Sequence, residues 1–269
     1  MTTALVISTY KYSQVLNIIL DSISKQVKFP DEIIIAEDGN DHKTMEVIEF
    51  WKEKLFTNII HVKQKDLGFR KALILNKAIR TVKSDYIIQI DGDCIPDKYF
   101  VKDHLSEAKA GRYLYGTRIR VNKEFVPKYI NYYKTEKKNI SFSFFSPNIS
   151  KRFRKLRIPF LSKFFSQKSK ISKKFRGCNT SFWRKDFEDV NGYNNNFNGW
   201  GREDSDLMIR FHNMGLKSKR LKFMANLYHL DHDEKDKSKF DINDNIQSDT
   251  IINKKIKTSN GLFQSIHKS

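Results

Sequence analysis

The sequence predicts an α/β protein built on a mixed, mostly parallel sheet. Short apolar runs rich in β-branched residues alternate with stretches of helical periodicity through roughly the first ninety residues. This alternation is typical of consecutive βαβ units. With 269 residues, 39% of them hydrophobic, the chain can also bury a substantial core. The first part of the chain is therefore expected to form a half-domain of the nucleotide-binding type.

Each expected element has its own local pattern. Strands are expected at 4–8, 32–36, 59–62 and 86–90, where the apolar runs are short, and helices at 13–25, 42–56 and 69–82, where apolar residues recur at helical spacing. The fourth of these strands stops at Gly92, which is typical of a strand that turns into a loop. Further strands are expected at 113–121, 177–183 and 223–228, and a further helix at 207–214.

Composition divides the chain into three parts. Residues 1–121 carry the alternation of strands and helices, residues 122–176 form a basic, phenylalanine-rich insertion, and residues 177–269 hold a second acidic cluster and a polar tail. The cysteines are Cys94 and Cys178, which argues for a reducing compartment and against a disulfide framework. The N-terminus lacks the pattern of a signal sequence, and no apolar run reaches the roughly 18 residues that span a membrane. A cytoplasmic protein is expected.

The charge implies an anionic partner. The net charge is +19 and the pI is near 9.7, so the partner is nucleic acid, a phosphorylated ligand or an acidic membrane surface. Much of this charge lies in residues 151–176, which contain eleven cationic residues and no acidic one. They are Lys151, Arg152, Arg154, Lys155, Arg157, Lys163, Lys168, Lys170, Lys173, Lys174 and Arg176.

Apolar residues are interleaved with these cations, among them Phe153, Phe160, Phe164 and Ile171. The combination suits a segment at a membrane surface, where apolar side chains dip below anionic headgroups and each cation adds about 1 kcal/mol. A solvated insertion that packs a few phenylalanines onto its own domain is the alternative. Nucleic acid also fits the charge, but no recognisable nucleic-acid module accompanies it. An anionic membrane surface is the preferred partner, and nucleic acid is not expected.

Asp91-Gly92-Asp93 follows the apolar strand at 86–90. Ligand chemistry in α/β proteins lies outside the carboxyl ends of such strands. Carboxylate oxygens there suit Mg²⁺ or Mn²⁺, which bridge and neutralise the phosphate oxygens of a substrate. The alternative is a simple turn, in which Asp91 caps the strand end and Asp93 is solvated.

Polar residues end the first two strands as well. Ser8-Thr9-Tyr10 and Glu37-Asp38-Gly39 stand at these positions, where acids and hydroxyls can hydrogen-bond a ribose or a base edge. Gly68 and Arg70 then open the helix that carries Asn76. A glycine and a cation at a helix start offer donors to phosphate, although ordinary turn and surface roles would explain the same residues.

The second acidic cluster is Gly199-Trp200-Gly201-Arg202-Glu203-Asp204-Ser205-Asp206. Acids in the first turn of a helix are favoured by the helix dipole, so capping would account for Ser205 and Asp206. Capping does not account for a tryptophan between two glycines. This segment is interpreted as a mobile flap that offers an aromatic platform to a sugar, with one acid able to deprotonate a hydroxyl. His229 or His232, in a later polar loop, could complete a metal shell begun by Asp93.

These motifs, in this order, resemble the family 2 glycosyltransferases with the GT-A fold, over residues 4–232. Ser8-Thr9-Tyr10 resembles the family's first-strand motif, Glu37-Asp38-Gly39 its uridine contact and Asp91-Gly92-Asp93 its metal-binding Asp-X-Asp motif. The segment from Gly199 resembles the part shared with β-1,4-galactosyltransferases and chondroitin-polymerase-type transferases. Arg202 and Ser205 stand where the galactosyltransferases usually carry Gly and Asp, which leaves the sugar and acceptor open.

The resemblance implies a role for each motif. Asp204 would be the catalytic base and Glu203 would orient the acceptor, while Asp93 and His229 would bind the metal, with His232 as the alternative ligand. The donor would contact Ser8, Thr9, Tyr10, Glu37, Asp38, Asp91 and Gly92, together with Gly68, Arg70 and Asn76, which the helix start itself suggests, and the acceptor would contact Trp200, Gly201 and Arg202. Residues 1–121 would then be the donor half, 122–176 would face membrane or acceptor, and 177–269 would be the acceptor and catalytic half.

The expected activity is inverting, metal-dependent transfer of a hexose or N-acetylhexosamine from a UDP-sugar. Mn²⁺ or Mg²⁺ is the expected cofactor, and a saccharide or lipid-linked saccharide the expected acceptor, in lipopolysaccharide or capsule synthesis at the inner face of the cell membrane. The alternatives are a nucleic-acid-binding protein, favoured by charge alone, and a metal-dependent nucleotidyltransferase, which would not need the flap around Trp200. The oligomeric state stays open.

Overall fold

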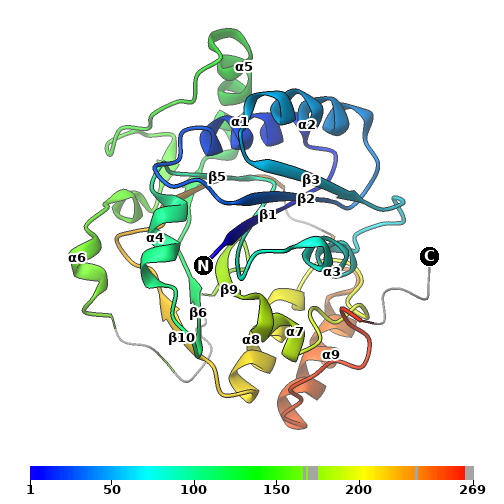
Figure 1. The fold of residues 1–269 in the computed structure, drawn as a ribbon. Coiled ribbons are helices and arrows are strands. Elements are labelled where there is room, and N and C mark those ends of the chain that lie inside the picture. Colours follow the sequence, from blue (N-terminus) through cyan, green and yellow to red (C-terminus); the bar gives the residue numbers. More distant parts are fainter. Residues whose placement is uncertain (166–167, 169–174, 234–235, 264–269) are drawn as a thin grey trace.

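The computed structural model describes residues 1–165, 168, 175–233 and 236–263. In this part of the chain a seven-stranded and a four-stranded sheet combine with helices on both sides of the larger sheet (Figure 1). The strand order is β10-β6-β9-β4-β1-β2-β3 in the larger sheet and β5-β11-β7-β8 in the smaller one. The predicted α/β class with a mixed, mostly parallel sheet is confirmed.

The first part of the chain alternates strands and helices, as predicted. Its elements are β1 (Thr3–Thr9), α1 (Ser13–Ile23), β2 (Glu32–Glu37), α2 (His42–Lys54), β3 (Asn58–Lys63), α3 (Lys71–Thr81) and β4 (Tyr86–Asp91). These four strands are parallel, with Leu5 of β1 opposite Ile33 of β2 and Ile88 of β4. Their carboxyl ends therefore lie at one edge of the sheet, where the predicted polar motifs stand.

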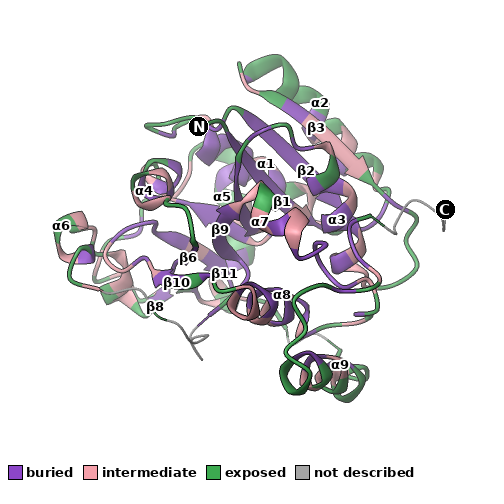
Figure 2. Cartoon of the chain, turned by 60° about the horizontal axis from the view of Figure 1, so that its bottom comes forward, coloured by how far each residue is buried: buried purple, intermediate pink, exposed green. Residues whose placement is uncertain are grey.

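Side chains alternate between two cores along these strands. Leu5 and Ile7 pack on the face covered by α1 and α2, whereas Ala4 and Val6 pack on the face covered by α3. All four side chains are completely buried, because strands in a sheet with helices on both faces are apolar on both sides. The buried strands run through the middle of the molecule in Figure 2. This rigid double core holds the strand ends in position.

The later elements include shorter strands, which complete both sheets. They are β5 (Cys94–Pro96), α4 (Phe100–Glu107), β6 (Arg112–Tyr115), β7 (Ile119–Val121), η1 (Lys123–Phe125), α5 (Val126–Glu136), β8 (Ile149–Ser150), η2 (Arg152–Lys155), α6 (Pro159–Ser162), β9 (Asn179–Trp183), α7 (Arg184–Asp189), α8 (Glu203–Asn213), β10 (Lys217–Arg220), β11 (Leu227–Leu230) and α9 (Phe240–Ile252). β9 lies antiparallel between β4 and β6.

The single strand predicted at 113–121 is wrong, because β6 and β7 belong to different sheets. Gly116 stands at the break, where its N–H donates to the Asn179 carbonyl at 2.9 Å. A Cβ at this position would lie 2.2 Å from the Asn179 side chain. The chain passes too close to Asn179 for a continuous strand with side chains on both faces.

Two element starts differ from prediction by four residues each, and one helix was not predicted. The helix expected at 207–214 begins at Glu203 instead, so both acids of the second cluster lie in its first turn. The strand expected at 223–228 begins only at Leu227, because Phe223 and Ala225 have positive φ angles of 59° and 50° that no strand accommodates. The polar tail contains the helix α9, whose polar sequence concealed it.

Candidate active site

A pocket of about 430 Å³ opens at the carboxyl ends of β1 and β4. It brings together residues from both ends of the chain. The lining residues are Ser8, Thr9, Tyr10, Tyr12, Asp38, Phe69, Lys71, Ile74, Asp91, Gly92, Asp93, Arg118, Arg120, Arg176, Gly177, Cys178, Trp200, Glu203, Asp204, His229, Asp231, His232, Asp233 and Lys237. The first-strand motif, the Asp-Gly-Asp motif, the second acidic cluster and both histidines therefore meet at one place.

The ends of β1 and β4 are held together by direct hydrogen bonds. Ser8 Oγ donates to Asp91 Oδ1 at 3.1 Å, and the Gly92 N–H donates to the Ser8 carbonyl at 2.6 Å. A Cβ on residue 92 would lie 2.7 Å from that carbonyl oxygen, so only glycine permits this approach. Gly92 thus fixes the backbone between Asp91 and Asp93 against the end of β1.

Lys71 is a pocket residue that sequence reasoning missed. It is the first residue of α3, and its Nζ lies 2.9 Å from Asp91 Oδ1, 3.2 Å from Asp204 Oδ2 and 3.7 Å from Glu203 Oε1. Burial disfavours the charged ammonium, but the carboxylates of Asp204, Asp91 and Glu203 outweigh it and raise the pKa of Lys71 well above its ordinary value. One buried ammonium therefore joins the Asp-Gly-Asp motif to the second acidic cluster.

The sequence contains only a weak indication that Lys71 belongs to the site, namely that it is a cation at the start of a helix. The neighbouring Arg70 has the same property and was the residue predicted to contact phosphate. Arg70 turns away from these acids. Its guanidinium donates to the Lys65 carbonyl, and its backbone N–H donates to Asp38 Oδ2 at 2.6 Å. Only the contact of Lys71 with Asp204 of α8, far away in the sequence, distinguishes these two adjacent cationic residues at the helix start.

Asp204 occupies a tightly fitted position in the first turn of α8. Tyr193 Oη lies 3.3 Å from Asp204 Oδ1 and 2.9 Å from Gln89 Oε1. A Cβ on Gly177 would lie 1.9 Å from Asp204 Oδ2, so the carboxylate packs directly on the glycine backbone. Any side chain at position 177 would displace the Asp204 carboxylate.

The two acids of α8 share one electrostatic environment. Burial, followed by the charge of Asp204, raises the pKa of Glu203 to about 7. Burial also raises the pKa of Asp204, while Lys71 opposes the rise. Because Asp204 lies closer to the Lys71 ammonium than Glu203 does, Asp204 carries the negative charge and Glu203 takes up a proton first. The pair thus has one ionised and one titrating carboxyl group near neutral pH.

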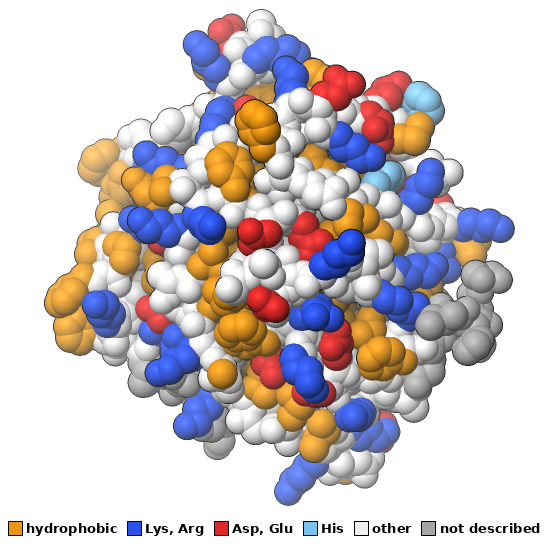
Figure 3. Space-filling view, viewed as in Figure 1, with side chains coloured by type: hydrophobic (Ala, Val, Ile, Leu, Met, Phe, Trp, Pro, Cys, Tyr) orange, Lys and Arg blue, Asp and Glu red, His pale blue; other side chains and the backbone are white. Residues whose placement is uncertain are grey.

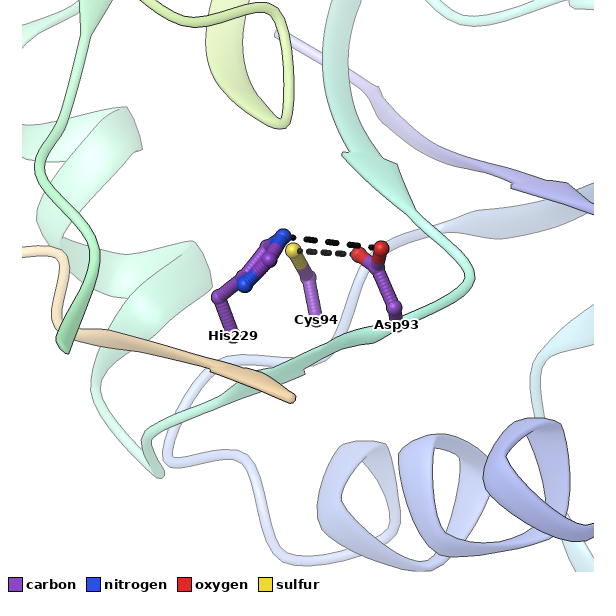
Figure 4. Close-up of side chains that lie close together, drawn as sticks. All are labelled: Asp93, Cys94 and His229. Carbon is purple, nitrogen blue, oxygen red and sulfur yellow. Dashed lines mark hydrogen bonds and ion pairs between the residues drawn. The ribbon is translucent and has the colours of Figure 1, made fainter. Parts of the chain in front are cut away.

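Asp93, Cys94 and His229 offer ligand atoms that all lie within 4.8 Å of one another (Figure 4). β5 and β11 pair antiparallel, with His229 opposite Cys94, which brings the histidine to the Asp-Gly-Asp motif. Asp93 Oδ2 lies 3.5 Å from His229 Nε2 and 3.2 Å from His232 Nε2. Both candidate histidines therefore reach the same carboxylate oxygen.

The donor set fits divalent cations that accept carboxylate and imidazole ligands. Burial alone would raise the pKa of Asp93, but the imidazoles of His232 and His229 outweigh it and lower the pKa below the ordinary aspartate value. Burial raises the pKa of the Cys94 thiol well above its ordinary value. A carboxylate with imidazoles suits these cations better than a protonated thiol does. Asp93 with one or both histidines is the candidate ligand set.

The structure places some of the other predicted residues in the pocket and others away from it. Ser8, Thr9, Tyr10 and Asp38 line the pocket, whereas Glu37, Gly68, Arg70, Asn76, Gly201 and Arg202 do not. Glu37 is completely buried, where it accepts from the Asp41 N–H and contacts His61, and Asn76 donates to the Tyr193 carbonyl at 2.8 Å. Both are packed inside the fold.

Trp200 lies at the pocket rim with its side chain 38% exposed. Its ring stacks on Phe240 of α9, with the centroids 6.1 Å apart and the planes at 24°. Arg202 is drawn to the same helix by an ion pair with Asp244 at 2.6 Å. Gly199 and Gly201, on either side of Trp200, adopt positive φ angles of 76° and 109°. α9, in the polar tail, therefore supports the segment that carries Trp200.

Comparison with known sequences establishes the family. The profile described as glycosyl transferase family 2 matches residues 4–188, and that described as the N-terminal domain of galactosyltransferase matches residues 161–233. The first match covers most of the chain, so the chain belongs to glycosyl transferase family 2. The predicted family and the predicted enzyme class, glycosyltransferase, are both confirmed.

Particular relatives are similar over limited ranges. The chondroitin synthase of Pasteurella multocida (strain Pm70) is 29% identical over 105 residues, which is 39% of this chain and 11% of that protein. S. aureus TarS in complex with UDP has a TM-score of 0.63 at 14% identity, over 94% of this chain and 66% of that one. A mannosyltransferase from Pyrobaculum calidifontis in complex with GDP-Man and Mn²⁺ has a TM-score of 0.58 at 16% identity, over 84% and 56%. The GT-A fold is thereby shown.

Proposed function

We propose that the protein catalyses inverting, metal-dependent transfer of a hexose or N-acetylhexosamine from a UDP-sugar to a hydroxyl group of a saccharide acceptor. The observation that carries this proposal is the ion-pair cluster at the strand ends, in which Lys71 contacts Asp91 and Asp204. It places a carboxylate that can accept a proton beside the motif that resembles the family's metal site. Family membership favours this activity over nucleic-acid binding and over nucleotidyl transfer.

Asp204 is the proposed catalytic base. Its carboxylate accepts the proton of the acceptor hydroxyl while the hydroxyl oxygen forms a bond to the anomeric carbon. The bond from the anomeric carbon to the donor phosphate breaks on the opposite face, and nucleoside diphosphate leaves with that electron pair. Lys71, 3.2 Å from Asp204, holds the carboxylate ionised and oriented. A positioned base of this kind contributes about 10² to 10⁴-fold in rate.

Asp93, with His229 or His232, would hold the divalent cation. Mn²⁺ or Mg²⁺ there supplies positive charge to the departing diphosphate. Ser8, Thr9, Tyr10 and Asp38 line the side of the pocket proposed for the nucleoside, and Trp200 lines the side proposed for the acceptor sugar. The solved neighbours with UDP and with GDP-Man and Mn²⁺ support a nucleotide-sugar donor.

The test is donor hydrolysis and transfer measured with a panel of UDP- and GDP-sugars, with Mn²⁺, with Mg²⁺ and with chelator. We expect release of nucleoside diphosphate from a UDP-sugar only when metal is present. Asp204→Asn should lower kcat by about 10² to 10⁴-fold while the dissociation constant of UDP stays within twofold.

Asp189→Asn, a surface substitution on α7, is the matched control and should leave kcat unchanged. Equal losses of UDP binding and turnover in Asp204→Asn would contradict the base assignment. Product that carries nucleoside monophosphate, in place of free diphosphate, would identify a nucleotidyltransferase and refute the proposed reaction.

We also propose that the enzyme works at the inner face of the cell membrane, on a saccharide or lipid-linked saccharide of lipopolysaccharide or capsule. The support is a group of exposed phenylalanines in the basic insertion: Phe145, Phe153, Phe160 and Phe164 are 80%, 71%, 64% and 71% exposed. Hydrophobic and basic side chains gather at the left edge of the molecule, over α6 (Figure 3). Lys170, Ile171, Lys173 and Lys174 of the predicted membrane segment lie outside the described residues.

Within the described residues, no helix combines the length and apolar character needed to cross a bilayer. The proposed binding is interfacial, through the exposed phenylalanines and cations, and sedimentation with vesicles tests it. Phe160→Ser/Phe164→Ser should reduce binding to anionic vesicles about tenfold or more, because two aromatic side chains no longer enter the interface. Phe29→Ser/Phe56→Ser, a pair of exposed phenylalanines elsewhere, is the control. Equal binding to neutral and anionic vesicles would contradict the proposal.

A further inference from the structure

Six cationic side chains gather beside the pocket, on the segments that follow β6. We name them the basic cluster, and they are Arg118, Arg120, Lys151, Arg154, Arg176 and Arg220. β7 and β8 pair antiparallel with Arg120 opposite Ser150, which brings Lys151, the next residue, close to Arg120. Arg154 Nη1 donates to the carbonyl of Arg118 at 2.9 Å. The cluster is therefore assembled from distant parts of the chain by strand pairing and by a hydrogen bond.

The basic cluster has little acidic compensation. Arg120 pairs with Asp231 at 2.8 Å. Within the described part of the chain, Arg118, Lys151, Arg154 and Arg220 form no ion pair with an acidic residue, and the Arg220 Nε is buried without a hydrogen-bond partner. Such a concentration of positive charge is costly unless an anion joins it.

Partial burial and mutual repulsion lower the pKa of two members of the cluster, Lys151 and Arg154. Partial burial, followed by the charges of Arg154 and Arg120, lowers the pKa of Lys151. Partial burial, followed by the charges of Arg220 and Arg118, lowers the pKa of Arg154. These side chains are thus close enough to act together on one ligand.

The positions of the six cations distinguish between two possible ligands, the nucleoside diphosphate of the donor and the acceptor. Arg118, Arg120 and Arg176 line the pocket, whereas Lys151, Arg154 and Arg220 lie outside it. A nucleoside diphosphate at the strand ends could contact only the inner members. An acceptor, by contrast, must enter the pocket to reach Asp204 and must extend out of it. Arg176 immediately precedes Gly177, the residue that packs directly on Asp204, so the cluster begins beside the proposed base.

We propose that the basic cluster is a subsite for an anionic saccharide acceptor, whose carboxylate or phosphate groups pair with these cations while its hydroxyl reaches Asp204. This inference rests on the proposed function and names the class of acceptor. Arginine suits the role because its planar guanidinium binds carboxylate and phosphate through paired hydrogen bonds. Charges on successive sugar units engage the inner and outer members together.

Binding of three oligosaccharides of equal length tests the inference: one with carboxylates, one with phosphates and one uncharged. We expect at least one charged probe to bind the wild-type protein at least tenfold more tightly than the uncharged one, with affinity falling as salt is added. Arg154→Gln/Arg220→Gln should remove most of this preference. Lys43→Gln/Lys185→Gln removes the same charge from exposed positions on α2 and α7 and should preserve the preference. The two charged probes tell carboxylate from phosphate recognition.

Three results would overturn the inference. One is equal binding of charged and uncharged probes. Another is a loss of UDP affinity in Arg154→Gln/Arg220→Gln as large as the loss of oligosaccharide affinity, which would assign the cluster to the donor. The third is a loss of anionic-vesicle binding with oligosaccharide binding unchanged, which would assign it to the membrane.

Donor hydrolysis separates this inference from the proposed function. A protein that hydrolyses nucleotide sugars without charge preference fails only the inference, and one that hydrolyses none fails the proposed function.

Discussion

The acidic residues around Lys71 line the pocket, and the basic cluster begins in the same pocket and extends out of it, but the charges of the two groups are balanced in different ways. Asp91, Glu203 and Asp204 surround one ammonium group at 2.9 to 3.7 Å. In the basic cluster, four of the six cations have no acidic partner among the described residues. Each acid of the first group contacts a cation of the chain itself, whereas most members of the second group contact no acidic residue of the described chain.

The difference separates two kinds of site. Charges that the chain itself pairs are fixed in place before any ligand arrives, which suits groups that must orient a reacting proton. Charges left without partners retain their attraction for a ligand and suit recognition. Substitutions within the two groups should therefore differ in sign and size.

The largest effect is expected from Lys71→Met. This change leaves one buried carboxylate, of Glu203, and two partly buried ones, of Asp91 and Asp204, without their cation, which should lower the free energy of unfolding by about 3 kcal/mol. It should also raise the pKa of Asp204, so the acidic limb of the kcat profile should move to higher pH. Urea unfolding and a pH profile of donor hydrolysis measure the two effects.

Lys151→Met is the matched control from the basic cluster. It relieves repulsion from Arg154 and Arg120, so stability should stay the same or rise and the pH profile should not move. If Lys71→Met and Lys151→Met had the same free energy of unfolding and the same pH profile, the proposed difference between the two groups would be refuted.

An intermediate effect is expected from Gly177→Ala, at the junction of the two groups. The new Cβ would require Asp204 Oδ2 to move from a separation of 1.9 Å, and misplacement by about 1 Å can cost about 10²-fold in rate. We expect a loss of this order in kcat with UDP affinity maintained. Gly39→Ala, whose Cβ would meet Tyr10 at an ordinary 3.6 Å, should retain most of the activity; equal kcat in the two variants would refute the packing argument.

The smallest effect is the pH dependence of stability that arises from Glu203. Its pKa is raised to about 7 from an ordinary value of 4.5, so between these pH values the folded protein retains a proton that the unfolded chain releases. Stability contributed by Glu203 should therefore fall as the pH rises from 4.5 to 7. Glu203→Gln should flatten that part of the stability curve; an unchanged slope in this variant would show that other groups cause it.

The predictable part of the fold was the part with local periodicity. β1 to β4 and the helices between them follow from apolar runs and helical spacing. The strand at 113–121 was wrong because its pattern is continuous while Asn179, far away in the sequence, forces a break at Gly116. α9 was missed because a helix that buries mainly polar residues has no apolar stripe to detect.

The candidate site was predictable where a motif stands on contiguous residues. Asp91-Gly92-Asp93 and Glu203-Asp204 were identified in this way, and both line the pocket. Lys71 was not identified, because its significance depends on Asp204, 133 positions later in the chain. The choice between His229 and His232 also could not be made from sequence, since β11 brings His229 to Asp93 and the residues just after β11 bring His232 to the same carboxylate.

By itself, then, the sequence determined the family, the α/β class and the acidic motifs at the strand ends, because periodicity and short motifs are properties of neighbouring residues. Only the tertiary structure decided which charges are paired. It enclosed Lys71 among three carboxylates and left Arg118, Lys151, Arg154 and Arg220 without acidic partners in the described part of the chain. The physical reason is that Coulomb energy depends on distance in space and on burial, and neither can be read from positions along a chain.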